Sequence, residues 1–224
     1  MFLLWKMEQA TLHFNKLTIE RQQNMEADFL YLNDVIPDAI IDLRYASDYN
    51  FVGQRIDGYL SSRPSLARPA AEGLAAAAED FRRLGYRILI FDAYRPQRAV
   101  DHFIRWSLDP NDLGNPTFYE GTPKNEIFAK GFLSKRSAHS RGSAVDITIV
   151  HPDGSPVDMG GGFDWFKPVS YTECPDITDE QRANRRLLAK VVTAHGFKSI
   201  TTEWWHFKLI DEPYPDTFFD FPVQ

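Results

Sequence analysis

The sequence carries two short groups of residues that could hold a metal ion between them. In the first group, His139 and Asp146 are seven residues apart, and Gly142 lies between them. Imidazole nitrogen and carboxylate oxygen are both ligands that zinc accepts. Glycine adopts left-handed backbone conformations at little cost, so a chain reversal is easiest at Gly142. We therefore expect His139 at the end of a loop and Asp146 on the following strand, with both side chains directed to one point.

The second group is Glu203-Trp-Trp-His206. A third ligand from His206 would complete a set of two imidazoles and one carboxylate. Such a set leaves the fourth position of a tetrahedral zinc ion open to water, as in catalytic rather than structural sites. Zinc lowers the pKa of its water toward about 7. A nearby carboxylate, for which Glu203 is the candidate, can then accept a proton while the water attacks a carbonyl group.

The spacing of Glu203 and His206 makes a geometric demand. Residues three apart in a regular strand face opposite sides of the sheet, so both side chains can point inward only if the backbone bends between them. A helix would satisfy the spacing, but the aromatic and β-branched residues from 201 to 207 are poor helix formers. We predict that Glu203 lies at the start of a strand or at a bulge.

A third group, Asp92-Ala-Tyr-Arg95, follows a short apolar run that reads as a buried strand. A charge there is costly unless it has a partner or a task. A guanidinium at a zinc site can stabilise the oxyanion that forms during hydrolysis, which is the role expected of Arg95. Asp92 could either cap a turn or pair with Arg95.

Other features of the chain are interpreted without a catalytic role. A single histidine is more often a surface or core residue than a ligand. We therefore expect no metal-binding role for His13, His102, His151 and His195. The Met159-Gly-Gly-Gly162 stretch lacks the Lys-Ser/Thr that completes a phosphate-binding loop. Cys174 is the single cysteine, so an intramolecular disulfide is excluded, and its acidic surroundings disfavour a reactive thiolate.

Periodicity and capping signals indicate the elements that position these groups. Helical spacing is expected for three segments, of which the last begins with a Thr178–Gln181 capping box. The expected helices are 69–84, 96–106 and 179–195, with a shorter one from 122 to 131, and the expected strands are 87–94, 143–150 and 201–209. Short gaps between the late strands favour a mostly antiparallel sheet flanked by helices, in a single α+β domain.

Composition limits the partners of the chain. Its 224 residues suit one domain, which we expect to span 26–224 after an N-terminal extension over 1–25. The net charge of -6 and the absence of a basic–aromatic stripe argue against nucleic acid. No apolar run approaches the roughly 20 residues of a membrane span. Because the apolar N-terminal run is too short for a signal peptide, a cytoplasmic rather than periplasmic location is expected.

Taken together, the motifs resemble those of the D-alanyl-D-alanine dipeptidase family, which includes the vancomycin-resistance dipeptidases. The resemblance covers roughly residues 28 to 224 and keeps the family's order. It rests on Phe91-Asp-Ala-Tyr-Arg-Pro-Gln-Arg-Ala99, Ser137-x-His139-Ser-Arg-Gly-Ser-Ala-Val-Asp-Ile-Thr148, Met159-Gly-x-x-Phe-Asp164, Asn184-Arg-Arg, Glu203-Trp-Trp-His206 and Asp211-Glu-Pro-Tyr-Pro.

The resemblance implies the zinc-bound α+β fold shared with D,D-carboxypeptidases and a hedgehog signalling domain, and hydrolysis of free D-Ala-D-Ala. It implies one zinc ion per chain on His139, Asp146 and His206, with Glu203 as the base. It further implies that Arg95 stabilises the transition state and that Ser137 and Asp164 bind the ammonium group of the substrate. Ala138 and the segment after Asp164 depart from the family pattern, which puts the substrate range, rather than the mechanism, in question.

Two alternatives remain open at this stage. The first is a zinc D,D-carboxypeptidase or endopeptidase that acts on intact cell-wall peptides. The second is a non-catalytic zinc-binding module on the same fold, against which Glu203 and Arg95 argue because a binding module needs neither residue.

Overall fold

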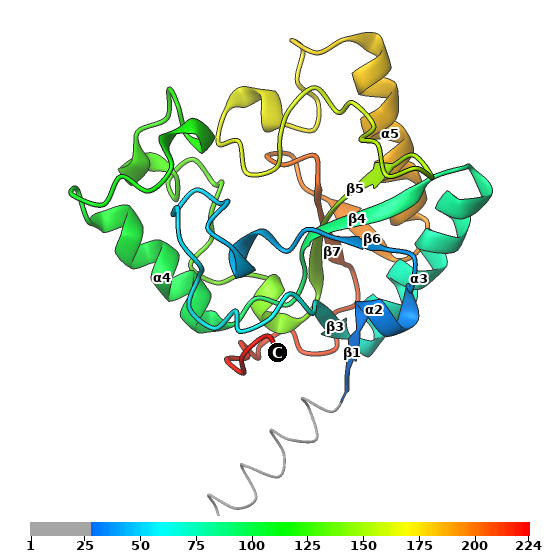
Figure 1. The fold of residues 1–224 in the computed structure, drawn as a ribbon, viewed down its shortest axis with the longest axis horizontal. Coiled ribbons are helices and arrows are strands. Elements are labelled where there is room, and N and C mark those ends of the chain that lie inside the picture. The colour runs from blue at the N-terminus through cyan, green and yellow to red at the C-terminus, as the bar shows by residue number, and fades with distance from the viewer. Residues whose placement is uncertain (1–27) are drawn as a thin grey trace, which may run out of the picture.

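A five-stranded sheet forms the centre of the computed structural model, which describes residues 28–224 (Figure 1). The β2–β4 pair is parallel and the other three neighbouring pairs are antiparallel. In spatial order the strands are β2 (Ile40–Ile41), β4 (Arg87–Asp92), β5 (Ala144–Val150), β7 (His206–Leu209) and β6 (Phe197–Ser199). The expected α+β class with a mostly antiparallel sheet is confirmed.

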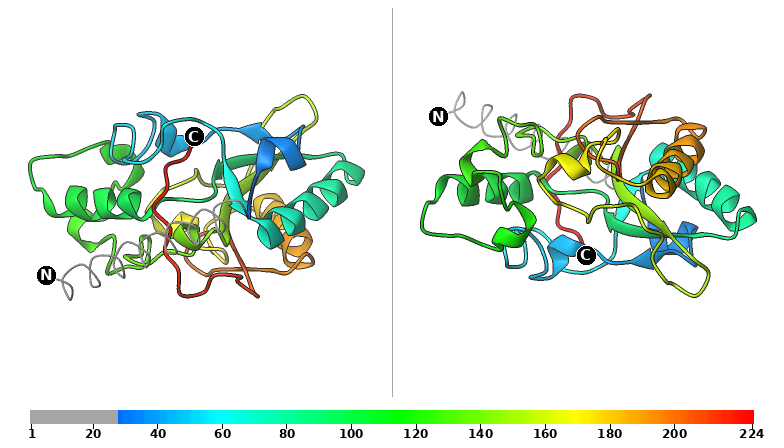
Figure 2. Two further views of the ribbon diagram at one scale, coloured as in Figure 1. Left: turned by 90° about the horizontal axis from the view of Figure 1, so that it is seen from below. Right: turned by 90° about the horizontal axis from the view of Figure 1, so that it is seen from above.

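Helices cover both sides of this sheet. Figures 1 and 2 show α3 (Arg68–Arg83) and α5 (Asp179–Thr193) on one side and α4 (Gln97–Leu108) on the other. The smaller elements are β1 (Phe29–Tyr31), α2 (Leu32–Val35), η1 (Arg44–Ala46), β3 (Ser65–Ala67), η2 (Pro116–Phe118), η3 (Lys124–Glu126), η4 (His139–Arg141) and η5 (Pro168–Ser170). β1 and β3 pair as a separate antiparallel ribbon.

The long helices form where local signals predict them. Thr178 caps α5 in a complete capping box, with its side chain accepting from the backbone N–H of Gln181. Gly85, with φ +84°, follows the C-terminal end of α3 in the left-handed conformation that a glycine there adopts without strain. One face of α3 is buried through alanines and larger apolar residues, which include Leu74 and Phe81.

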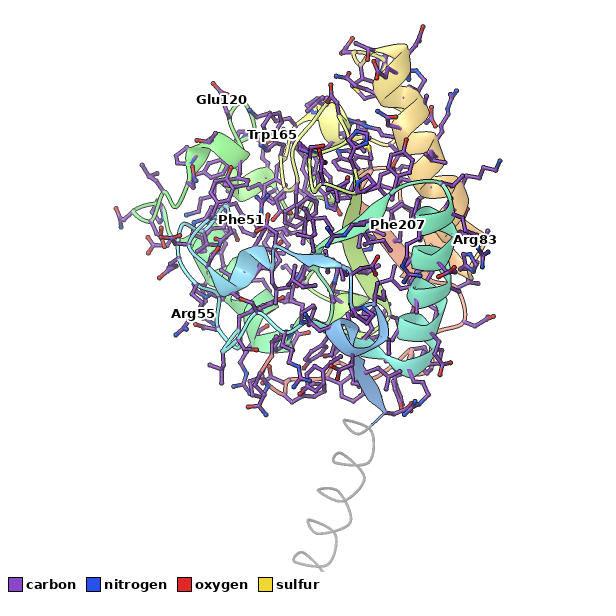
Figure 3. All side chains as sticks on the ribbon, turned by 45° about the vertical axis from the view of Figure 1, so that its right-hand side comes forward. Phe51, Arg55, Arg83, Glu120, Trp165 and Phe207 are labelled. Atoms are coloured by element: carbon purple, nitrogen blue, oxygen red, sulfur yellow. The ribbon has the colours of Figure 1, made fainter. Side chains whose placement is uncertain are left out.

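Alternation along the strands divides the sheet into two different faces. Phe207 and Leu209 of β7 are buried on one face, while His206 and Lys208 lie on the opposite face. Phe197, which pairs with Leu209 of β7, lies against Gly73 of α3, whereas Figure 3 shows Arg55, Arg83 and Glu120 on the outside of the molecule. The face away from α3 therefore receives the polar side chains of the strands, and this is where a site can form.

Three sequence predictions were too long. The strand expected over 87–94 ends at Asp92. The strand expected over 201–209 contains only His206–Leu209, because the backbone N–H of Trp204 donates to the carbonyl of Ser170 and leaves the ladder. The helix expected from 122 to 131 is reduced to the single 3₁₀ turn η3. The expected extension over residues 1–25 lies outside the described part of the chain. Within residues 28–224, every helix is too short or too polar to cross a membrane.

Candidate active site

Three acidic or imidazole side chains lie in one row across the sheet. Asp92 on β4 is paired with Asp146 on β5, and Asp146 is paired with His206 on β7. Residues that are directly paired across neighbouring strands point to the same face. The register of three strands therefore brings Asp146 and His206 together and places Asp92 next to them.

His139 reaches this row from the turn η4. Gly142 closes the turn with φ +68°, and a Cβ at this position would come within 2.4 Å of the Phe29 ring. Only glycine meets both demands. The His139 Nδ1 atom lies 2.6 Å from the carbonyl oxygen of Ala93. Since a carbonyl only accepts, Nδ1 carries the proton and Nε2 keeps a lone pair for a metal.

The three predicted ligands fit one metal ion. His139 Nε2 lies 3.1 Å from His206 Nδ1 and 3.4 Å from an oxygen of Asp146, and His206 Nδ1 lies 3.0 Å from the other Asp146 oxygen. Ligands about 2.0–2.2 Å from a tetrahedral zinc ion are about 3.3–3.6 Å apart. Two imidazole nitrogens and one carboxylate with this spacing match the donor set of a zinc site.

Electrostatics keep these groups in the forms that bind a metal. Burial acts to raise the pKa of Asp146, but His139 and His206 outweigh it and hold this pKa well below its usual range. Burial lowers the pKa of His206. Asp146 is therefore a carboxylate and His206 a neutral imidazole near pH 7, as metal binding requires.

Glu203 precedes β7 and turns toward the same place. Its carboxylate lies 3.8 Å from His206 Nδ1, and its side chain is 10% exposed. The sequence predicts Glu203 at the start of a strand or at a bulge; the residue lies outside the regular strand, as the spacing demands, but at the turn that precedes β7, which begins only at His206. Burial, followed by the negative charges of Asp146 and Asp164, raises the pKa of Glu203 well above its usual value. A carboxyl group with raised proton affinity is suited to accept a proton at neutral pH.

Arg95 lies beside the row and is held by carboxylates. Its Nε donates to Asp92 at 2.9 Å, and a terminal nitrogen lies 3.4 Å from Asp146. The guanidinium also packs over the rings of Tyr45 and Phe103 at 4.9 and 5.3 Å. Of the two roles open for Asp92, the structure shows the ion pair with Arg95.

Asp164 and Ser137 lie on two loops near the metal ligands. Asp164 has φ +58° and accepts a 2.8 Å hydrogen bond from the Tyr45 hydroxyl. Burial, followed by the charge of Asp146, raises the pKa of Asp164 to about 8. The Ser137 hydroxyl accepts from the backbone N–H of His139 at 3.2 Å. A buried carboxyl group with no cation at hydrogen-bonding distance among residues 28–224 is suited to bind a positively charged ligand.

One small pocket of about 130 Å³ brings all seven sequence-predicted residues together. Pockets for drug-sized ligands measure about 300–1,000 Å³, so this one suits a smaller molecule. It is lined by Tyr45, Arg95, Gly131, Phe132, Leu133, Ser134, Arg136, Ser137, Ala138, His139, Asp146, Asp164, Ile200, Glu203 and His206.

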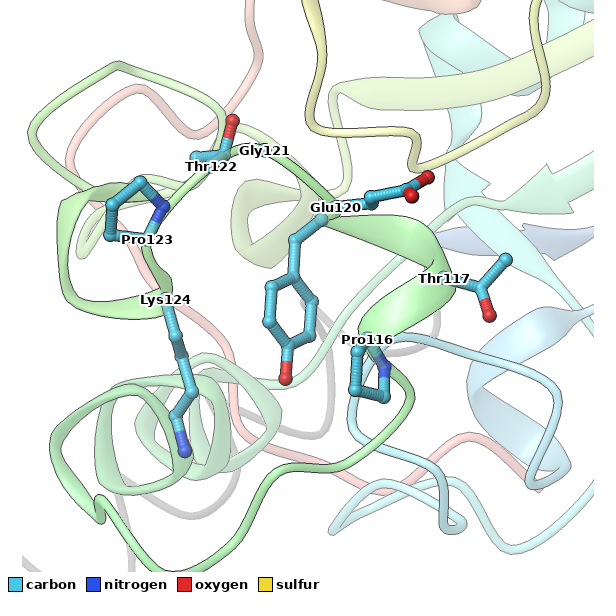
Figure 4. A pocket seen from close by; sticks show the side chains of 8 residues that line it. Pro116, Thr117, Glu120, Gly121, Thr122, Pro123 and Lys124 are labelled. Carbon is cyan, nitrogen blue, oxygen red and sulfur yellow. The ribbon is translucent and has the colours of Figure 1, made fainter.

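A larger hollow of about 790 Å³ lies over residues 116–124 (Figure 4). Its lysine and tyrosine side chains already have partners inside the protein. The Lys124 ammonium donates to the carbonyl oxygens of Asp109 and Asp112, and the Tyr119 hydroxyl donates to that of Leu113. The chemistry-bearing residues lie in the smaller pocket, and that pocket is the candidate site.

Sequence reasoning assigned no role to two residues that shape the site. Tyr45 bonds Asp164 across 119 positions of sequence, and no local pattern indicates such a contact. Arg185 is buried in α5 and donates to the carbonyl oxygens of Met159, Val169 and Tyr171 at 2.7–2.9 Å. An arginine in helical phase with the apolar Leu188 and Val192 was the available signal for a buried role.

Comparison with known proteins gives the family. The D-ala-D-ala dipeptidase family model matches residues 25–224, and this chain belongs to that family. The chain is 40% identical over 201 residues to a D-alanyl-D-alanine dipeptidase of Streptomyces coelicolor. The aligned region covers 89% of this chain and 100% of the relative. It is 41% identical over 202 residues to a D-alanyl-D-alanine dipeptidase of Enterococcus faecalis, with the same coverage.

Among solved structures, a vancomycin-resistance D,D-pentapeptidase in complex with Zn(II) is similar at a TM-score of 0.40. The sequence identity is 14%, and the similarity covers 68% of this chain and 77% of that one.

Proposed function

We propose that the protein hydrolyses free D-alanyl-D-alanine to two molecules of D-alanine, with one zinc ion held by His139, Asp146 and His206. The observation that carries the proposal is the convergence of the two imidazole nitrogens, 3.1 Å apart, on the Asp146 carboxylate, whose two oxygens lie 3.0 and 3.4 Å from them, beside the buried carboxyl group of Glu203. Relatives that match this chain over 89% of its length bear the name of that dipeptidase, which supports the choice of substrate.

The residues of the chain divide the chemistry between them. Zinc, when bound, would supply a Lewis acid that lowers the pKa of water and polarises the scissile carbonyl. Glu203 takes a proton from the attacking water and returns it to the leaving amine. Arg95, fixed by Asp92, donates to the oxygen on which negative charge develops.

Recognition of a free dipeptide falls to Asp164 and Ser137. An ammonium group one residue from the scissile bond would pair with the Asp164 carboxylate, which contacts Tyr45 but no cation at hydrogen-bonding distance among the described residues. This pairing favours ionisation of a carboxyl group whose pKa burial raises to about 8. The small volume of the pocket, about 130 Å³, also favours a short substrate.

The test combines metal analysis with a hydrolysis assay on the zinc-loaded protein. We expect one zinc ion per chain, hydrolysis of D-Ala-D-Ala, and little hydrolysis of N-acetyl-D-Ala-D-Ala, which lacks the ammonium group. Rapid cleavage of the acetylated peptide would instead indicate a D,D-carboxypeptidase. Stoichiometric zinc without hydrolysis of either compound would indicate a binding module.

A further inference from the structure

The site pocket contains one cationic side chain for which the proposed reaction has no use. The pocket is lined by the carboxyl groups of Asp146, Asp164 and Glu203 and by the guanidinium groups of Arg95 and Arg136. Arg95 is buried and bound to Asp92 and Asp146 beside the metal ligands. Arg136 is the remaining positive charge on the pocket wall.

Arg136 is exposed and has no carboxylate partner among residues 28–224. Its guanidinium packs on the ring of Phe218, with 4.5 Å from Cζ to the ring centroid. Stacking on an aromatic ring limits the orientations of the guanidinium while its N–H groups stay available at the edge. The side chain is thus held in place and still free to bind an anion.

The segment that carries Arg136 is a wall of the pocket. Residues 131–134 and 136–139 line it, whereas the side chain of Lys135 does not. The Ser134 hydroxyl donates to the carbonyl oxygen of Arg136 at 2.8 Å and fixes the local turn. The neighbouring Ala138 has no hydroxyl to offer a substrate, and within residues 131–139 Arg136 is the cationic side chain that lines the pocket.

A free dipeptide presents an anion that must be accommodated. If its ammonium group pairs with Asp164 and its carbonyl lies at the metal ligands, its carboxylate extends beyond the scissile bond. The pocket already contains three carboxyl groups, so an unpaired fourth negative charge would be repelled. The planar fork of an arginine matches a carboxylate through two parallel hydrogen bonds.

We propose that Arg136 binds the C-terminal carboxylate of the dipeptide substrate. This inference rests on the proposed function and deepens it, because both charged termini of the substrate would then be recognised, by Asp164 and by Arg136. Arg136 is on this view a specificity-determining residue, with no part in the proton transfers.

The experiment compares D-Ala-D-Ala with D-Ala-D-Ala amide, which lacks the carboxylate, on the zinc-loaded wild-type protein and on Arg136→Gln. We expect KM for the free acid to rise about tenfold or more, as for loss of a hydrogen bond between charged groups, with kcat within about twofold. KM for the amide should be the same in both proteins. Arg136→Lys should restore part of the preference for the acid, since the charge remains without the fork.

Lys135→Gln is the matched control, because it removes the same charge one residue away from a side chain that does not line the pocket. The inference is overturned if Arg136→Gln leaves KM for the acid unchanged, raises KM for acid and amide equally, or is matched in its effect by Lys135→Gln. A wild-type protein that does not hydrolyse D-Ala-D-Ala contradicts the proposed function itself, so the two failures are distinguishable.

Discussion

The pocket has one side with the proposed metal ligands His139, Asp146 and His206, here the metal side, and another with the proposed ammonium-binding residues Ser137 and Asp164, here the substrate side. The two sides are built in different ways. On the metal side, the register of β4, β5 and β7 lines up Asp92, Asp146 and His206, and the short turn η4 adds His139. Strand pairing sets the positions of Asp146 and His206, and an irregularity in β4 between Ile90 and Asp92 brings Asp92 into the same row. On the substrate side, loops carry the functional groups, and single side chains from distant segments hold those loops.

Asp164 illustrates the substrate side. Its backbone is in the left-handed conformation, at φ +58°, which costs free energy for a residue other than glycine. The Tyr45 hydroxyl holds its carboxyl group, and Arg185 holds the loop through carbonyls on both sides of it. The metal side therefore depends on strand pairing, and the substrate side depends on a few long-range contacts. Substitutions on the metal side should therefore change zinc content or kcat, and substitutions on the substrate side should mainly change KM.

The largest effect is expected from removing a metal ligand. His206→Ala should lower the zinc content well below one per chain and reduce hydrolysis of D-Ala-D-Ala more than about 10³-fold, because metal assistance supplies several kcal/mol of transition-state stabilisation. His151→Ala, which changes an exposed histidine, is the control. Full zinc content and activity in His206→Ala would show that the row is not a metal site.

Glu203→Gln should leave the metal in place and remove the base. We expect kcat to fall about 10²- to 10⁴-fold, the usual contribution of general base catalysis, with zinc content unchanged. Glu120→Gln, at an exposed position, should keep normal kinetics. Comparable turnover by Glu203→Gln and wild type would exclude Glu203 as the base.

On the substrate side, Asp164→Asn should reduce kcat/KM about 30-fold or more, since losing one partner of a buried charge pair costs about 2–5 kcal/mol. The loss should appear mainly in KM, because the metal ligands and Glu203 are unchanged. The same variant should lose little activity on a substrate without an ammonium group. A fall in kcat alone would contradict the assignment.

Asp164→Asn should also change stability in the opposite direction to activity. The pKa of Asp164 is raised to about 8 in the folded protein, above its unfolded value of about 3.9. The folded state therefore binds more protons between these values, and its stability falls as pH rises through this window. In denaturant unfolding of the metal-free proteins, the free energy of unfolding of Asp164→Asn minus that of the wild type should increase from pH 4 to pH 8. A pH-independent difference would contradict the buried carboxyl group as its cause.

The difference between the two sides also explains what the sequence could reveal. His139, Asp146 and His206 lie in short motifs on adjoining elements, so spacing and ligand chemistry indicate their proximity. The bend before His206 could also be predicted, because Glu203 and His206 are three residues apart and would face opposite sides of a regular strand. By contrast, the contact between Tyr45 and Asp164 joins residues 119 positions apart, and only the folded chain brings them together. The length of β7 was overestimated because a backbone bond to Ser170, invisible in local propensity, ends the ladder.

The contacts of Arg185 are also long-range and could not be predicted from the sequence. Substitution of Arg185 gives the smallest expected effect that still distinguishes the two sides of the pocket. Its guanidinium satisfies three carbonyls in the loop that carries Asp164 and packs on Trp204, 5.5 Å from the ring centroid. Arg185→Met keeps the length of the side chain but leaves those carbonyls without their donor. The variant should lower the denaturant midpoint, because each buried unsatisfied group costs about 1–3 kcal/mol. It should also raise KM for D-Ala-D-Ala several-fold with a smaller change in kcat.

Arg182→Met supplies the control that separates positioning from stability. Arg182 is on the same helix and also donates to backbone carbonyls, but those of Cys174, Pro175 and Ile177, beyond the loop of Asp164. It should lose stability without a rise in KM. If both variants raise KM in proportion to their loss of stability, the effect is general loosening of the fold. If only Arg185→Met raises KM, α5 orients the substrate side through one buried guanidinium, while strand pairing and the turn η4 maintain the metal side.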